Sequence, residues 1–136
     1  MEPDMKRSIA AVITATLLAG PLAAQGYPAN GRLHFTPLEN GVRIEGRTGF
    51  GARGIWCAAA DYARDQLGAR GDQDIYVSEP RVRGLGQSNA VSFTLDPTGL
   101  TPSDVVIVGP SLGRQGARLS VGHALSFCVD FYLPNR

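Results

Sequence analysis

Apolar and polar residues alternate along two neighbouring segments, residues 32–35 and 42–47. Successive side chains of a strand point to opposite faces, so a period of two marks a strand with one buried face. Between the two segments, residues 39–41 (Glu-Asn-Gly) have the composition of a tight hairpin turn. The pattern therefore predicts an antiparallel hairpin over residues 32–47.

The period changes to that of a helix over residues 55–67. One face of this helix carries an apolar side chain every three or four residues: Trp56, Ala60, Ala63 and Leu67. The opposite face is expected to meet solvent, and it carries Asp61, Arg64 and Asp65. Gly68 follows where a left-handed residue commonly ends a helix. The glycine-rich residues 49–54 are expected to form the bend before the helix.

Four later segments complete the predicted secondary structure. Residues 74–77 and 90–95 are predicted strands, and the segment 104–108, which is apolar throughout after Asp104, is typical of a strand buried on both faces. In the last stretch, residues 118–131, the odd positions are mostly apolar, which favours a strand with a break at Gly122. A helix is the alternative, and its apolar stripe would consist of Val121, Ala124, Leu125 and Cys128.

Together these elements predict an α+β fold. We expect a mostly antiparallel sheet of about five or six strands with one main helix packed on it. Residues 32–136 have the usual size of one domain with its own core, and no internal repeat interrupts them.

The N-terminal segment has the pattern of a secretory signal peptide. Lys6 and Arg7 precede an almost purely apolar run at residues 9–18, and small residues follow at 23–24. This order of basic, apolar and small residues is the one that signal peptidase recognises.

A membrane anchor is the alternative interpretation of the same segment. It would need about 20 apolar residues, but Gly20-Pro21 interrupts the run earlier. We therefore expect residues 1–24 to be removed and residues 25–31 to form a flexible leader. The mature protein is then expected in the periplasm or outside the cell, without a membrane span.

Cys57 and Cys128 are the only two cysteines, and both follow the signal segment. In an oxidising compartment two such cysteines most simply pair with each other. A catalytic redox pair would normally be Cys-x-x-Cys, which is absent. We therefore expect one structural disulfide that ties the first turn of the helix to the C-terminal segment.

The charge of the chain narrows the class of partner. A net charge of +1 argues against a partner chosen by bulk charge, such as nucleic acid. After the signal segment, every basic residue is an arginine. Arginines suit phosphate and carboxylate ligands, but they are equally common on ordinary solvated surface, and we interpret them so. The sequence leaves the partner unknown, with another envelope protein as the candidate.

Residues 49–54 spell G-x-G-x-x-G between a predicted strand and a predicted helix, as in dinucleotide-binding folds. The preceding strand alternates, however, whereas a central parallel strand would be apolar throughout. The acidic residue at the end of the next strand, Glu79, also comes later than the expected spacing of about 20 residues. We interpret these glycines as a turn and expect no cofactor.

Residues 109–113 spell G-x-S-x-G, the motif that places the nucleophile in α/β-hydrolases. Ser111, with His123 downstream as its base, is thus the candidate catalytic pair. No Asp or Glu lies between them, and Asp130 would invert the usual order of acid and base. We therefore assign no catalytic residue, keep Ser111 and His123 as the alternative, and expect residues 109–113 to form a surface loop.

A metal site is not expected from the sequence. His34 and His123 are the only two histidines, and no cysteine or carboxylate stands at ligand spacing near either. Zinc would need four ligands in a structural site or three in a catalytic one.

The Trp56-Cys57 helix after a glycine-rich turn, the strand at residues 75–77 and the late Cys128 resemble a set of small exported bacterial proteins. That set has no assigned activity. The resemblance implies the disulfide and the architecture, and it implies no catalytic residue.

These observations favour an exported, non-enzymatic binding or accessory module. A sharper version is an inhibitor of an envelope or secreted enzyme, with residues 109–116 as the inserting loop. The alternative is a small serine hydrolase, which needs His123 within hydrogen-bonding reach of Ser111. An inhibitor needs a protruding loop instead, and a binding module needs an exposed apolar patch.

Overall fold

The computed structural model describes residues 33–48, 51–87 and 89–129. The expected signal peptide and leader lie outside these residues, so cleavage after Ala24 stays a prediction. In chain order the elements are β1 (Leu33–Leu38), β2 (Gly41–Gly46), α1 (Gly51–Leu67), β3 (Asp74–Glu79), β4 (Val91–Thr94), β5 (Ser103–Asp104), the 3₁₀ helix η1 (Gly109–Gly113), β6 (Ala117–Ser120) and α2 (Val121–Ser126).

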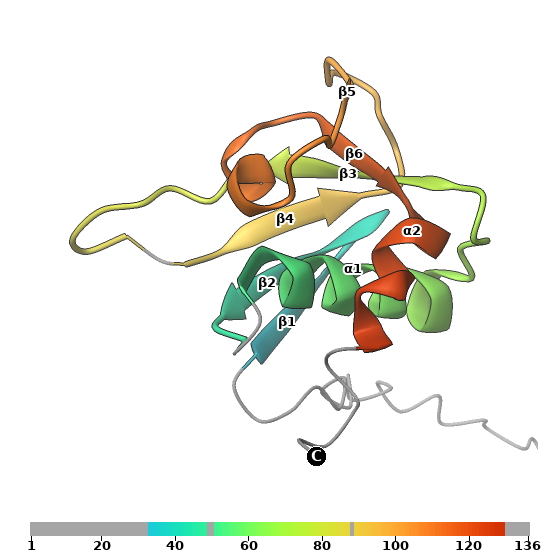
Figure 1. Ribbon diagram of the computed structural model, residues 1–136, viewed down its shortest axis with the longest axis horizontal. Helices are drawn as coiled ribbons and strands as arrows, with labels where there is room; N and C mark the ends of the chain where they lie inside the picture. Colours follow the sequence, from blue (N-terminus) through green and yellow to red (C-terminus); the bar gives the residue numbers. More distant parts are fainter. Residues whose placement is uncertain (1–32, 49–50, 88, 130–136) are drawn as a thin grey trace, which may run out of the picture.

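Within the described residues, six strands form one sheet in the order β1-β2-β4-β3-β6-β5. Neighbouring strands are antiparallel, except that β5 and β6 are parallel. Helix α1 packs on the sheet and α2 packs against α1 (Figure 1). The predicted α+β fold, a mostly antiparallel sheet with one main helix, is confirmed, and α2 is a small second helix.

Strands β1 and β2 form the hairpin that the alternation predicts, with its turn at residues 39–40. β1 is an edge strand, and an edge tolerates Pro37 because proline has no N–H to donate to a further strand. Gly41 is required by close packing, since a Cβ there would overlap the backbone carbonyl of Phe93 in β4. Strand β2 of this hairpin pairs with β4 and so joins the hairpin to the rest of the sheet.

Helix α1 begins at Gly51, before the predicted start at Ile55, so part of the expected glycine-rich bend is helical. The whole stretch Gly54–Ala63 is buried, and α1 contacts β2, α2 and η1. The helix is therefore covered on more sides than its single apolar stripe indicated. Gly68 has φ +65° and ends the helix in the left-handed conformation that the sequence predicts.

Asp61 corrects the expected polar face of α1. Its residue is only 5% exposed, whereas Arg64 and Asp65 are exposed as predicted. Arg64 forms an ion pair with Asp61 and also binds Asp65 at 2.8 Å. A buried carboxylate is tolerated when a cation compensates it, and Arg64 supplies that cation one turn away on the same helix.

The segment at residues 104–108 is not the buried strand that its pattern predicts. Only Ser103–Asp104 pair with β6, and Val106 and Ile107 are 88% and 70% exposed. β5 is the last strand at its edge of the sheet among the described residues. No strand or helix of the described part of the chain covers Val106 and Ile107, and the run leaves the sheet toward η1.

The ambiguous C-terminal stretch contains both of the structures considered for it. Strand β6 ends at Ser120, and the helical alternative is correct from Val121 to Ser126, where the strand prediction was wrong. Ser120 explains the change, because its Oγ accepts the His123 N–H at 3.1 Å and caps α2. Phe131 lies outside the described residues.

Trp56 and Cys57 lie at the centre of the core. Both are fully buried, and the Trp56 ring meets Phe93 of β4 edge-on with 5.0 Å between ring centroids. Cys57 forms the predicted disulfide with Cys128, with an S–S distance of 2.12 Å. Because α1 starts at Gly51, Cys57 lies in its second turn rather than its first. The bridge joins α1 to the chain just after α2.

Candidate functional site

Ser111, the candidate nucleophile, lies in η1 and is completely buried. Pro110 at the start of this short helix has the φ angle that a first helical turn needs. The indole Nε1–H of Trp56 donates to Ser111 Oγ at 2.8 Å, and this Oγ donates to the Val108 carbonyl at 2.5 Å. The expected surface loop is therefore wrong at Ser111 and Leu112, both of which pack into the core.

These two hydrogen bonds define what the Ser111 hydroxyl does in the structure. A hydroxyl has one proton to donate, and that proton goes to a backbone carbonyl rather than to a base. The hydroxyl also satisfies the Trp56 N–H, which would otherwise be an unpaired donor in the core. Ser111 thus anchors η1 onto α1.

His123 lies in α2, and its surroundings differ from those of a catalytic base. The residue is exposed, and its ring is 5.3 Å from that of Phe127, centroid to centroid. No hydrogen bond among the described residues joins the His123 ring to Ser111 or to a carboxylate. Asp130, the acid considered with this pair, lies outside the described residues.

The glycine motif at residues 49–54 is explained by packing. Helix α1 already begins inside the motif at Gly51. A side chain at Gly54 would overlap that of Thr48, so this glycine lets the helix lie against the chain that leaves β2. Gly49 lies outside the described residues. In the part of the chain that the structure describes, no three His, Cys, Asp or Glu side chains form a potential metal site.

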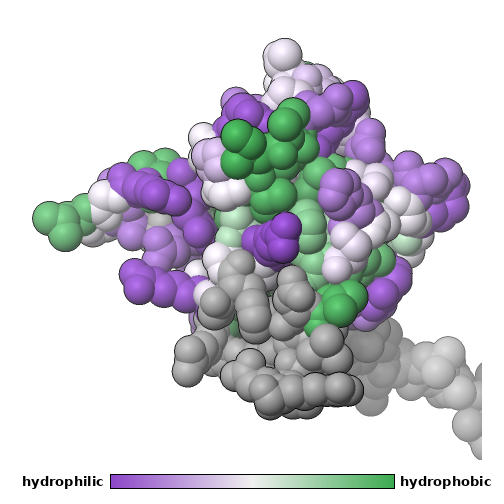
Figure 2. All heavy atoms as spheres, viewed as in Figure 1, coloured by the Kyte–Doolittle hydropathy of each residue, from purple (hydrophilic) through white to green (hydrophobic). Residues whose placement is uncertain are grey.

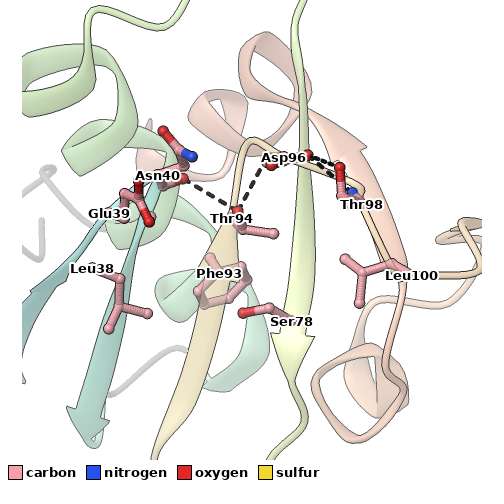
Figure 3. A pocket seen from close by; sticks show the side chains of 10 residues that line it. Leu38, Glu39, Asn40, Ser78, Phe93, Thr94, Asp96, Thr98 and Leu100 are labelled. Atoms are coloured by element: carbon pink, nitrogen blue, oxygen red, sulfur yellow. Dashed lines mark hydrogen bonds between the residues drawn. The ribbon is translucent and has the colours of Figure 1, made fainter.

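A hollow of about 290 Å³ opens beside the β1–β2 turn, with Glu39 and Asp96 on opposite sides of it (Figure 3). Asp96 Oδ1 accepts the backbone N–H and the hydroxyl of Thr98, at 3.0 and 2.6 Å. These bonds hold the pKa of the Asp96 carboxyl below its usual value. Thr94 Oγ1 in turn accepts the Asp96 N–H and donates to the Asn40 carbonyl. The polar groups here bond to one another, which favours a structural role.

The connection between β5 and η1 presents a second surface feature, an exposed apolar pair formed by Val106 and Ile107. Figure 2 shows hydrophobic atoms gathered over this connection, near the top of the view. The Val105 N–H donates to the Arg118 carbonyl at 3.2 Å, and the Val108 carbonyl accepts the Ser111 N–H at 3.1 Å. The pair is thus fixed to the sheet on one side and to η1 on the other.

An ion pair strengthens the sheet side of this connection. Arg118 Nε in β6 lies 2.6 Å from Asp104 Oδ1 in β5, and Asp74 lies 4.0 Å from the same guanidinium. The hydrogen bond and the charge of Asp104, followed by the charge of Asp74, raise the pKa of Arg118 above its usual value. The short strand β5 is therefore held in place by side chains as well as by its backbone.

Sequence reasoning missed the exposed pair because a run of four apolar residues, 105–108, has the same pattern whether it is covered or not. It placed the inserting loop at residues 109–116, just after the pair that the structure exposes. It also missed the role of Ser111, since the partner Trp56 lies 55 residues earlier in the chain.

No helix among the described residues is long and apolar enough to cross a bilayer. No protein-family model matches the sequence, and no curated protein or solved structure gives a match either.

Proposed function

We propose that this protein is an exported, non-enzymatic binding or accessory module that docks onto another envelope protein. The observation that supports this proposal is the exposed pair Val106–Ile107, held on a fixed connection. Exposed apolar side chains that lie together favour a protein–protein contact. Because both ends of the connection are hydrogen-bonded, little conformational entropy is lost when a partner covers it.

An inhibitor of an envelope or secreted enzyme is the sharper form of this proposal. The inserting element would be the connection at residues 105–108, which lies at the edge of the sheet outside β6. Ser111 ties the end of this connection to α1 through Val108 and Trp56, and an inserting loop requires such a fixed base. A disulfide is also typical of proteins in oxidising compartments, which supports export.

The hydrolase alternative receives less support from the contacts of its candidate residues. Ser111 is buried and donates its proton to Val108, while His123 is exposed on α2. A serine nucleophile needs a base that accepts its proton and a site that a substrate can enter. The contacts of Ser111 therefore favour the binding module.

The experiment is affinity capture from an envelope extract with the wild type and with a Val106→Ser/Ile107→Ser double variant. We expect the wild type to retain a protein that the double variant loses, and purified partner and wild type to form a complex of fixed stoichiometry. A matched control, Val129→Ser, changes another exposed apolar residue and is expected to retain the partner. Equal capture by the wild type and the double variant would contradict the proposal.

A further inference from the structure

Three arginines at one end of the sheet have no carboxylate partner among the described residues: Arg47, Arg81 and Arg83. β2 and β3 both run antiparallel to β4, so they end at the same end of the sheet, and these arginines follow those two ends. The nearest carboxylates along the chain, Glu45 and Glu79, both pair with Arg43, at 3.0 and 3.9 Å. With Arg43 included, four arginines face these two carboxylates, so this end of the sheet carries an excess of positive charge.

Arg81 is the most constrained of the three. Its backbone N–H donates to the Leu112 carbonyl of η1 at 2.7 Å, so its Cα is fixed. Its side-chain Nε is buried and has no hydrogen-bond partner. Burial, and then the charges of Arg83 and Arg47, hold the pKa of Arg81 below its usual value. A buried guanidinium N–H without an acceptor costs free energy, and an oxyanion is the ligand that would satisfy it.

The segment that follows Arg81 carries apolar residues at its tip. Gln87 N–H donates to the Gly84 carbonyl at 3.3 Å, and Gly86 has φ +77°, so residues 84–87 form a turn with Leu85 at its second position. Leu85 is fully exposed and Val82 is 55% exposed. Turn tips are usually polar. Figure 1 shows the β3–β4 connection reaching away from the sheet, and Figure 2 shows its hydrophobic tip beside hydrophilic atoms.

We propose that the segment at residues 81–87, together with Arg47, binds the surface of a membrane that contains anionic phospholipid. The arginines hold headgroup phosphates through forked N–H groups, and Leu85 and Val82 enter the boundary between headgroups and acyl chains. A soluble phosphate could satisfy Arg81, but it would leave Leu85 in water. The combination of unpaired arginines with an apolar tip therefore favours the lipid surface.

This binding surface differs from the exposed pair of the proposed function, so either one can fail without the other. The experiment is co-sedimentation of the full chain with vesicles of phosphatidylcholine alone and of phosphatidylcholine with phosphatidylglycerol. We expect binding only to the second, and weaker binding as salt rises. Leu85→Ser is expected to lower the vesicle affinity about tenfold, and Arg83→Gln about fivefold.

Two control variants separate this segment from the rest of the surface. Arg70→Gln removes the same charge from an exposed arginine that pairs with Asp72, and Val129→Ser removes an exposed apolar residue elsewhere. Both are expected to bind vesicles like the wild type. Every variant carries the same N-terminus, so differences between variants report on the changed residue. Unchanged melting temperatures would show that each variant folds.

A calorimetric titration with inorganic phosphate distinguishes the two sources of the ligand. Phosphate binding without vesicle binding would overturn the proposal in favour of a soluble oxyanion. Vesicle binding that survives both Leu85→Ser and Arg83→Gln would overturn it as well, and so would the absence of binding to either probe. Vesicle binding that both variants weaken, while the two controls retain it, would support the proposal.

Discussion

Residues 55–60 of α1 and residues 105–108 between β5 and η1 are both runs of apolar side chains, but they meet different surroundings. The first run is buried throughout, because the sheet, α2 and η1 all contact α1. In the second run, Val106 and Ile107 face solvent at the edge of the sheet, although the residues on either side are partly buried. Both runs are apolar, and they differ in the surfaces of the protein that are available to cover them.

The comparison shows how burial depends on where a run lies in the topology. The α1 run is joined to distant parts of the chain by the Cys57–Cys128 disulfide and by the Trp56–Ser111 hydrogen bond. Among the described residues, the backbone hydrogen bonds of the 105–108 run are at its two ends, Val105 and Val108. Since burial is the main source of stability, substitutions in the two runs are expected to have very different effects.

The largest effect is expected from breaking the bridge that holds the buried run. Cys57→Ser opens a loop whose cysteines are 71 residues apart, and the chain-entropy model gives a loss of about 4 kcal/mol for such a loop. The melting temperature is expected to fall by more than about 5 °C. Thermal unfolding followed by circular dichroism measures this change.

Cys128→Ser is the matched control for this prediction and is expected to give the same loss, because either change removes the one bridge. Thiol titration of the unfolded, unreduced protein from an oxidising compartment is expected to find no free thiol. Two free thiols per chain would contradict the disulfide and the cross-link of α1 to the C-terminal segment.

The second prediction tests the two runs directly with one substitution in each. Ile55→Ala removes a fully buried side chain and is expected to cost about 3 kcal/mol through lost burial and a cavity. Ile107→Ala removes an exposed one and is expected to change stability by less than about 0.5 kcal/mol. Urea unfolding of both variants measures the difference. Equal losses would mean that residues 105–108 are covered in solution, and the contrast between the runs would fail.

The third prediction compares two serines near the second run, Ser111 and Ser103. Ser111→Ala leaves the Trp56 N–H without an acceptor and is expected to cost about 2 kcal/mol. Ser103 Oγ is buried without a partner, so Ser103→Ala is expected to be neutral or stabilising. Chemical unfolding of the two variants measures both changes, and a clear loss of stability in Ser103→Ala would contradict the second expectation.

Ser111→Ala also tests the hydrolase alternative in the same preparation. We expect no esterase activity in the wild type that this substitution removes. An activity that disappears in a variant that is still folded would show that Ser111 reacts, and would reverse the order of the two functional proposals.

Local patterns predicted the elements whose structure depends on near neighbours. The alternation on both sides of the Asn40-Gly41 turn predicted the hairpin, and the spacing from Trp56 to Leu67 predicted most of α1. The disulfide was predictable because two cysteines leave one pairing. In each case the decisive information lies in the residues themselves.

The errors concern residues whose surroundings come from distant parts of the chain. Asp61 is buried although it lies opposite the apolar stripe, and Val106 is exposed because the described residues place no strand beyond β5. Ser111 is structural because Trp56 reaches it across the core. The unpaired arginines could not be found from the sequence either, since ion pairs depend on the arrangement of strands in the sheet.

The smallest expected effect concerns an exposed carboxyl that local hydrogen bonds organise. Asp96 has a lowered pKa because Thr98 donates to it through its hydroxyl and its backbone N–H. A lowered pKa in the folded state favours folding above the ordinary pKa of Asp, about 3.9, and this contribution disappears as the pH falls through the lowered value. Thr98→Val is expected to raise the Asp96 pKa toward its ordinary value in an NMR titration.

Any stability difference between this variant and the wild type is expected at neutral pH and not in strong acid. A Thr98→Ser control keeps the hydroxyl and is expected to keep the lowered pKa. If Thr98→Val left that pKa unchanged, the Thr98 hydroxyl would not be the main cause of the lowered Asp96 pKa.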